Sequence, residues 1–326
     1  MQIGIINCYE IYNKKNSLFN PARYSIGENM EYPIVILKNK LNKMNSSIDT
    51  LDMYPIEKYD KIIFIDIPSC NIRYDYNLIS KDLYLILMES SLIKPENYIK
   101  ENHKCFKKIF TWNDELVDKK KYIKYYWPNK IPVSINFDIN SKSKLCTMIA
   151  GHKLRIHPLE LYSERIKAVR WFEENHIEDF DLYGIDWDKM IVGFNGNLID
   201  NNNYPSYKGR IESKNKILKK YKFCICYENA TGINGYITEK IFDCFFAGCI
   251  PIYWGVTNIT DSIPKNTFID KRDFSTYKEL YDYIKNMSQN EYIKYIDAIS
   301  AFIKSEQIQK FSAKGFAENI IKEIMD

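Results

Sequence analysis

The residues best able to do chemistry are gathered in one segment, 227–255, which joins two apolar runs. The first run ends at Tyr227, a glycine-containing loop follows, and a helix is predicted to begin at Thr238, a residue type that suits an N-cap. Glu239 and Lys240 then fall in the first turn, where the free N–H groups and the helix dipole attract anions such as phosphate. Thr238 and Glu239 alone fit an ordinary capped helix. The positive charge of Lys240 is unfavourable at the positive end of the helix dipole, so its presence there indicates a bound anion.

Alternating strands and helices are predicted to position this segment. In the N-terminal half we expect strands at 3–8, 61–67, 84–88 and 108–112 and a helix at 33–42. After a polar stretch at 136–144, strands are expected at 145–150, 181–183, 221–227 and 250–254, and helices at 159–175, 211–220 and 238–247. The strands are almost continuously apolar, which is typical of parallel sheets covered on both faces.

This alternation predicts an α/β protein built from two doubly wound, Rossmann-like domains that face a cleft. With the polar stretch as linker, the N-terminal domain spans 1–140 and the C-terminal domain spans 141–326. The last helices of the second domain could pack back on the first. Ligands bind beyond the carboxyl ends of the strands in such sheets, which is where the loop after Tyr227 is expected.

The composition excludes several classes of protein. Of the 326 residues, 45% are hydrophobic and 15% aromatic, which is too many for a disordered chain. The 46 basic residues nearly balance the 42 acidic ones, so no nucleic-acid partner is expected. There is no GxGxxG after the first strand and no P-loop, and neither the four histidines nor the eight cysteines have the spacing of a zinc site.

Three strings of residues, in order, resemble the donor-binding signature of the α1,3-fucosyltransferases, glycosyltransferase family 10. They are Glu228-Asn229, the hexapeptide GYITEK at 235–240 and the hexapeptide IPIYWG at 250–255. A weaker likeness extends over 80–290. The resemblance implies a glycosyltransferase-B fold in which the N-terminal domain binds the acceptor and the C-terminal domain binds GDP-fucose.

The resemblance also implies roles for four residues of this segment. Glu239 is expected to contact the donor sugar and Lys240 the diphosphate, while Asn229 and Tyr236 lie near the ribose and the diphosphate. These residue types suit the reaction, because the departing diphosphate gains negative charge and the sugar becomes oxocarbenium-like. A fixed cation stabilises the departing diphosphate, and a nearby carboxylate stabilises the positive charge on the sugar.

Two further roles are assigned by the same resemblance. An arginine on the helix after the first strand of the C-terminal domain holds the diphosphate, and Arg165 is the best match, with Arg170 as the alternative. The acceptor hydroxyl must lose its proton to a general base. The family places a glutamate for this purpose after a strand of the N-terminal domain, which Glu89 matches, with Glu96 as its competitor.

The resemblance thus implies an inverting transferase that moves fucose from GDP-fucose to a glycan hydroxyl in α1,3 linkage. Its partners are a nucleotide sugar and a glycan acceptor, and no metal or other cofactor is expected. DxD strings at 179–181 and 186–188 could hold a divalent cation, but Asp181 opens a predicted strand instead of ending one. Two alternatives stay open: a transferase of the same fold that uses another nucleotide sugar, and a glycan-binding protein whose transferase site has lapsed.

The sequence also predicts where the protein works. The run at 1–8 lacks the basic lead-in and cleavage site of a signal peptide, and no apolar stretch approaches the ~18 residues of a membrane helix. We expect a cytoplasmic protein of bacterial or viral type without a membrane anchor. Such a protein can still make peripheral contact with a membrane-linked acceptor.

Overall fold

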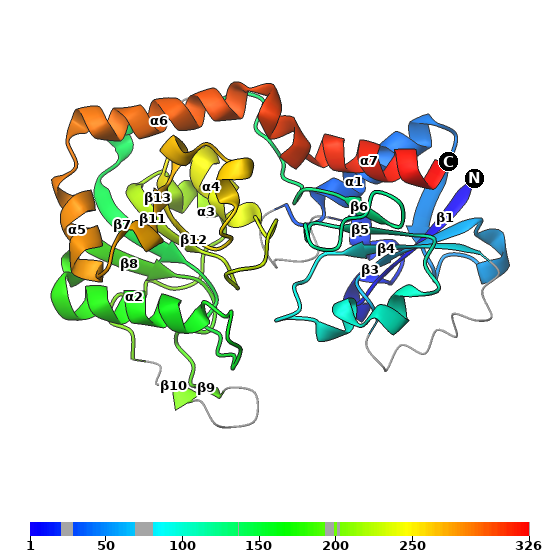
Figure 1. The fold of residues 1–326 in the computed structure, drawn as a ribbon, viewed down its shortest axis with the longest axis horizontal. Coiled ribbons are helices and arrows are strands. Elements are labelled where there is room, and N and C mark those ends of the chain that lie inside the picture. Colours follow the sequence, from blue (N-terminus) through cyan, green and yellow to red (C-terminus); the bar gives the residue numbers. More distant parts are fainter. Residues whose placement is uncertain (21–28, 69–80, 136, 193–198, 201–202, 326) are drawn as a thin grey trace. The chain divides into compact units, whose positions relative to one another are not determined.

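The computed structural model describes residues 1–20, 29–68, 81–135, 137–192, 199–200 and 203–325. The chain divides into two compact units, one made of Met1–Lys130 with Gln309–Asp326 and the other of Ile131–Ile308 (Figure 1). The domain boundary predicted from sequence lay at 140, ten residues after this division. The last 18 residues belong to the first unit, not the second.

The first unit is built on a parallel sheet whose six strands lie in the order β2-β1-β3-β4-β5-β6. The strands are β1 (Gln2–Asn7), β2 (Ser47–Thr50), β3 (Lys61–Ile65), β4 (Asp82–Leu87), β5 (Lys108–Thr111) and β6 (Tyr122–Lys124). Successive residues of β3, Ile62, Ile63 and Phe64, are all fully buried. Because neighbours along a strand point to opposite faces, both faces of this sheet are covered.

Two helices from opposite ends of the chain pack side by side in the first unit, α1 (Tyr32–Lys43) and α7 (Ala313–Met325) (Figure 1). Pro33 lies in the first turn of α1, where its missing N–H is not needed. Leu37 and Leu41 of α1 are fully buried, and Lys40 forms an ion pair with Glu318 of α7 at 2.8 Å. The return of α7 to this unit is therefore explained by an apolar helix face that needs covering.

The second unit contains another parallel sheet, with five strands in the order β13-β12-β11-β7-β8. Its strands are β7 (Lys144–Ile149), β8 (Phe180–Tyr183), β11 (Tyr221–Tyr227), β12 (Ile250–Trp254) and β13 (Ile269–Asp270), and β9 (Ile191–Val192) pairs separately with β10 (Ile199–Asp200). The helices are α2 (Tyr162–Asn175), α3 (Lys214–Leu218), α4 (Glu239–Phe246), α5 (Tyr277–Asn286) and α6 (Gln289–Lys304). Short 3₁₀ turns join many of these elements.

The predicted fold class, two parallel-sheet α/β domains, is confirmed. The strands expected at 221–227 and 250–254 have those bounds in the structure, and the other predicted strands differ by a few residues at their ends. The predicted helix at 159–175 begins later, at Tyr162. Strands β2, β6 and β13 were not predicted, because they are short and contain polar residues.

Among the described residues, no helix is both long enough and apolar enough to span a bilayer. The cytoplasmic location and the peripheral membrane contact stay predictions.

Gly184 follows β8, and its substitution tests how tightly the carboxyl ends of β7 and β8 are packed. Its φ is +135°, and a Cβ at this position would lie 1.8 Å from the carbonyl oxygen of Ala150. Gly209 also has a positive φ, +101°, but a Cβ there would meet nothing within 4 Å. We expect Gly184→Ala to lower the free energy of unfolding in urea by about 1–3 kcal/mol more than Gly209→Ala. Equal losses would contradict the close packing at Ala150.

Candidate functional site

The segment after β11 is tied to the start of α4 by one buried carboxylate. Glu228 directly follows the strand and is fully buried. Its Oε1 accepts the backbone N–H of Thr238 at 2.8 Å, and its Oε2 accepts the hydroxyl of Thr238 at 2.7 Å. Thr238 is the N-cap residue of α4, but its side chain makes no capping hydrogen bond. The predicted capping role of the Thr238 hydroxyl is therefore wrong: the hydroxyl donates to Glu228, and its oxygen accepts from Lys240 instead of from a backbone N–H of α4.

Lys240 and Glu239 lie beside this anchor. The Nζ of Lys240 donates to the Thr238 hydroxyl at 3.1 Å and lies 3.3 Å from Glu228 Oε2 and 3.7 Å from Glu239 Oε1. The side chains of Lys240 and Glu239 are 23% and 25% exposed. Both charged groups are thus held by neighbours while each keeps a part of its surface accessible to a ligand.

Both groups are ionised over the whole physiological pH range. Burial alone would raise the pKa of Glu239, but the ammonium groups of Lys240 and Lys214 lower it to about 2. Burial alone would lower the pKa of Lys240, but Glu239 and Glu228 raise it above its ordinary value. The start of α4 therefore presents a permanent cation next to a permanent anion.

Arg165 connects α2 to the same loop. Its guanidinium is buried, and Nη2 donates to the carbonyl of Tyr227 at 2.7 Å and to Oδ1 of Asn229 at 3.0 Å. The Nδ2 of Asn229 donates in turn to the hydroxyl of Tyr236 at 3.2 Å. Burial lowers the pKa of Arg165 below its ordinary, very high value. The structure therefore brings Arg165, Asn229 and Tyr236 into one chain of hydrogen bonds.

The alternative arginine is placed differently. Arg170 lies over the ring of Tyr204, 3.7 Å from its centroid, and pairs with Glu173 at 3.1 Å. The contacts described for Arg165 therefore link it to the loop after β11, whereas those described for Arg170 lie elsewhere.

Lys214 is a charged residue of this cluster that the sequence analysis did not foresee. It belongs to α3, and its Nζ lies 2.7 Å from Asp243 and 3.8 Å from Glu239. Helix α3 packs beside α4, whose buried Ile241, Phe242 and Phe245 hold it against the core. No local sequence signal marks Lys214, because only the packing of α3 on α4 brings it to Glu239.

The predicted base lies in the first unit. Glu89 comes two residues after β4 and is half-buried, and the hydroxyl of Tyr9 donates to its Oε1 at 3.4 Å. Its competitor Glu96 lies in the 3₁₀ turn Pro95–Tyr98, and its side chain is 50% exposed, 3.9 Å from Lys94. Glu89 thus has the more enclosed carboxylate of the two, and its catalytic role stays a prediction.

Three of the four carboxylates in the DxD strings are paired with basic residues. Asp179 is paired with Lys285, and Asp181 is paired with Lys144 and with Lys208 at 3.5 Å. Asp186 is paired with Lys189 at 2.8 Å. Within the described ranges, no group of three or more His, Cys, Asp or Glu residues is arranged to hold a metal ion.

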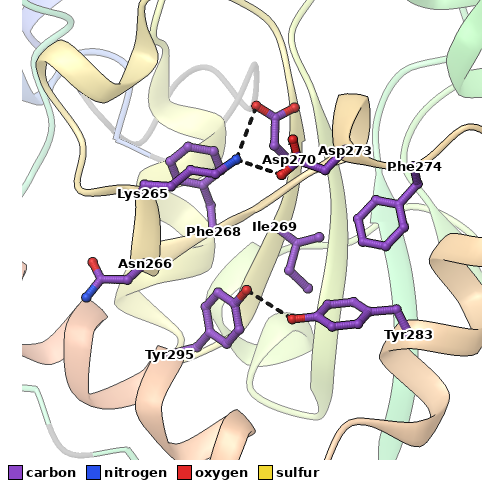
Figure 2. Close-up of a pocket in the computed structure, with 9 residues that line it drawn as sticks. All are labelled: Lys265, Asn266, Phe268, Ile269, Asp270, Asp273, Phe274, Tyr283 and Tyr295. Carbon is purple, nitrogen blue, oxygen red and sulfur yellow. Dashed lines mark hydrogen bonds and ion pairs between the residues drawn. The ribbon is translucent and has the colours of Figure 1, made fainter.

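A cavity of about 330 Å³ lies in the second unit beside β13, α5 and α6 (Figure 2). Its lining residues are Lys265, Asn266, Phe268, Ile269, Asp270, Asp273, Phe274, Tyr283 and Tyr295. Lys265 pairs with Asp273 at 2.8 Å, and the hydroxyls of Tyr283 and Tyr295 lie 3.2 Å apart. None of the predicted site residues lines this cavity, and its one lysine, Lys265, also lies 3.7 Å from the second lining carboxylate, Asp270.

Comparison with known proteins agrees with the resemblance found in the sequence. Residues 181–315 match the model of the glycosyltransferase family 10 (fucosyltransferase) C-terminal domain. The alpha-(1,3)-fucosyltransferase FucT of Helicobacter pylori is 43% identical over 75 residues, which are 23% of this chain and 16% of that protein. The GDP-fucose protein O-fucosyltransferase 3 of Gallus gallus is 41% identical over 85 residues, 25% of this chain and 18% of that one. The matches thus span less than a fifth of these relatives.

Solved structures share the fold over the whole chain. A crystal structure of an alpha1,3-fucosyltransferase with GDP has a TM-score of 0.56 at 16% identity and covers 100% of this chain and 90% of that one. An alpha-glucosyltransferase in complex with UDP-glucose and DNA has a TM-score of 0.59 at 11% identity and covers 100% of both chains. The resemblance to the family 10 fucosyltransferases and the two-domain glycosyltransferase fold are confirmed.

Glu228 is expected to be the residue on which the geometry of this site depends. Glu228→Gln removes the charge that accepts two hydrogen bonds from Thr238, so we expect the free energy of unfolding to fall by about 1–3 kcal/mol. A double-mutant cycle with Thr238→Val, measured by urea unfolding, should give a coupling of about 0.5–3 kcal/mol. The control is Glu178→Gln, since the side chain of Glu178 is 69% exposed. Additive effects of the two substitutions would contradict the direct contact.

Proposed function

We propose that this chain is an inverting fucosyltransferase that moves fucose from GDP-fucose to a glycan hydroxyl in α1,3 linkage. The observation that carries the proposal is the cluster at the end of β11. There the predicted Arg165, Asn229 and Tyr236 share one chain of hydrogen bonds, and Lys240 pairs with Glu239. The family match over 181–315 and the named activities of the relatives support the choice of fucose and of GDP.

The donor side of the reaction is assigned to the second unit. Lys240 and Arg165 supply positive charge to the diphosphate as the bond between the fucose carbon and the phosphate oxygen breaks. The positive end of the helix dipole at the start of α4 favours the same anion. Glu239 remains ionised because its pKa is about 2, so its carboxylate stabilises the positive charge that develops on the fucose.

The acceptor side is assigned to Glu89. The acceptor oxygen forms its new bond to the anomeric carbon of fucose from the face opposite the diphosphate, so a single displacement inverts that carbon. The hydroxyl proton passes to the Glu89 carboxylate, and the electron pair of the broken bond leaves with GDP. The residues in these roles need no further cofactor for this electron and proton balance.

The first test is calorimetric titration of the purified protein with GDP, UDP and CMP, with and without a chelator. We expect GDP to bind most tightly and its affinity to be the same in the chelator. Preference for UDP would instead indicate a transferase of the same fold with another nucleotide sugar. Absence of nucleotide binding, together with binding of a glycan, would favour the lapsed transferase.

The same titration tests Lys240. We expect Lys240→Ala to weaken GDP binding by roughly 10–100-fold, because a charged hydrogen bond to the diphosphate is lost. The matched control is Lys265→Ala, another lysine of the second unit that is paired with carboxylates but lies at the cavity of Figure 2. Wild-type GDP affinity in the folded Lys240→Ala variant would remove Lys240 from the donor site.

A separate measurement tests the base. We expect Glu89→Ala to lower the turnover number for transfer about 10²–10⁴-fold, because the proton of the acceptor hydroxyl has no acceptor. Binding of GDP-fucose, followed by calorimetry, should stay nearly unchanged. Glu96→Ala serves as the control and should retain turnover. The reverse result, with loss in Glu96→Ala only, would move the base to Glu96.

A further inference from the structure

Asp66 occupies an unusual backbone conformation directly after β3. Its φ is +59°, in the left-handed region, and only 2% of its surface is exposed. This conformation is uncommon for residues with a Cβ, and buried residues that adopt it cluster at functional sites. The N–H of Asp66 donates to the carbonyl of Ile86 in β4 at 2.9 Å, so the residue is fixed against the strand that leads to Glu89.

The side chain of Asp66 holds the backbone of Glu89 on its N–H side. Asp66 Oδ1 accepts the N–H of Met88 at 2.7 Å and the N–H of Glu89 at 3.2 Å. The same oxygen accepts the amide Nδ2 of Asn97 at 2.6 Å. Three donors therefore converge on one buried carboxylate oxygen, which stabilises the turn that carries Glu89.

The carbonyl of Glu89 is held as well. It accepts Nδ2 of Asn97 at 3.2 Å and the hydroxyl of Tyr98 at 3.3 Å. Asn97 is itself fixed, because its Oδ1 accepts the N–H of Ile67 at 2.8 Å and its carbonyl lies 2.8 Å from Nε2 of His103. The Glu89 backbone is thus bound on both sides, by the buried Asp66 and Asn97 and by the half-buried Tyr98, and Glu89 itself is half-buried.

The two carboxylates also affect one another electrostatically. Burial, and next the negative charge of Glu89, raise the pKa of Asp66 to about 7. Among the described residues, the titratable and charged groups that interact with the pair are Cys8 and Tyr9 after β1, Tyr98, and Tyr125 after β6, and Lys94 acts on Cys8. Burial raises the pKa of the thiol of Cys8 to about 12, so that group is neutral at working pH.

We propose that Asp66 is a positioning residue for Glu89: its buried carboxylate fixes the backbone of Glu89 and repels the charge of the Glu89 side chain. This inference rests on the proposed function only in that Glu89 is the base. Repulsion between like charges is mutual, so ionisation of Asp66 makes the Glu89 carboxylate a stronger proton acceptor. The pair holds one proton more readily than two free carboxylates would at the same pH.

Two substitutions separate the hydrogen bonds that Asp66 accepts from the negative charge that it carries. In Asp66→Asn, the amide oxygen can still accept all three donors that now meet Oδ1, but the negative charge is gone. In Asp66→Ala both are lost. The matched control is Asp60→Asn at the other end of β3, where an exposed carboxylate accepts the N–H of Gln2 at 2.7 Å.

The measurements are the pH dependence of turnover and the titration of the Glu89 carboxyl carbon by ¹³C NMR, assigned with Glu89→Gln. In the wild type, Asp66 ionises near pH 7 beside a Glu89 that is already charged, so turnover should rise and the ¹³C signal of Glu89 should show a step as the pH passes through 7. In Asp66→Asn we expect both changes near pH 7 to be lost. Asp66→Ala should lose turnover at every pH, and Asp60→Asn should behave as wild type. An unchanged Glu89 titration in Asp66→Asn would overturn the proposal.

Stability gives a second readout that needs no substrate. The pKa of Asp66 in the folded state, about 7, lies above its ordinary value of 3.8, so the folded protein binds more protons between these two values. The stability that Asp66 contributes is therefore present at low pH and is lost as the pH rises through 7. We therefore expect the urea midpoint of Asp66→Asn, relative to that of the wild type, to rise as the pH increases between these two pKa values. If the difference between the two midpoints does not change with pH, the carboxylate of Asp66 is not destabilised by burial.

The outcomes distinguish this inference from the proposed function. If the step near pH 7 in the Glu89 signal is lost in Asp66→Asn but the protein transfers no fucose, the coupling stands and the function fails. If Glu89→Gln retains turnover while Asp66→Asn removes the step near pH 7, Glu89 is not the base, and only the catalytic meaning of the coupling is lost.

Discussion

The structure around the predicted donor residues depends on the fully buried carboxylate of Glu228 at the end of β11. A buried anion is costly unless hydrogen bonds and a cation compensate it. Here the compensation comes from the N–H and hydroxyl of Thr238 and from the ammonium of Lys240 at 3.3 Å. The same contacts therefore fix where α4 starts and where its lysine lies. A phosphate ligand of Lys240 would bind a cation already held in place, so little side-chain entropy remains to be lost on binding.

The first unit also contains a buried carboxylate that accepts backbone hydrogen bonds, at the end of β3. Asp66, like Glu228, is a buried carboxylate that follows a parallel strand and accepts backbone N–H groups from a segment farther along the chain. The two differ in compensation. Glu228 has an ammonium group within 3.3 Å, whereas N–H and amide donors surround Asp66, and burial raises its pKa to about 7. The carboxylate of Glu228 is thus compensated by a cation, whereas that of Asp66 is close to titration at neutral pH.

The sequence predicted those features that depend on local pattern. Strands β11 and β12 were placed correctly because they are almost continuously apolar and are followed by Glu228 and by Gly255. The start of α4 was also correct, but the capping role of Thr238 was not, since its hydroxyl donates to Glu228 and accepts from Lys240. Lys214 and Asp66 carry no motif. Their places follow from the packing of α3 on α4 and from a left-handed turn beside β4, and neither is visible in residue spacing.

The charge arrangement separates donor binding from the response to pH. At the start of α4, Glu239 has a pKa of about 2 and the pKa of Lys240 is raised, so neither changes its charge between pH 4 and 9. In the first unit, Asp66 changes its charge near pH 7, and it does so at the N–H of Glu89. Under the proposed function, affinity for the nucleotide would then vary little with pH, while proton transfer from the acceptor would vary strongly. A transferase built in this way keeps its donor bound over a range of conditions and lets the pH act on the chemical step.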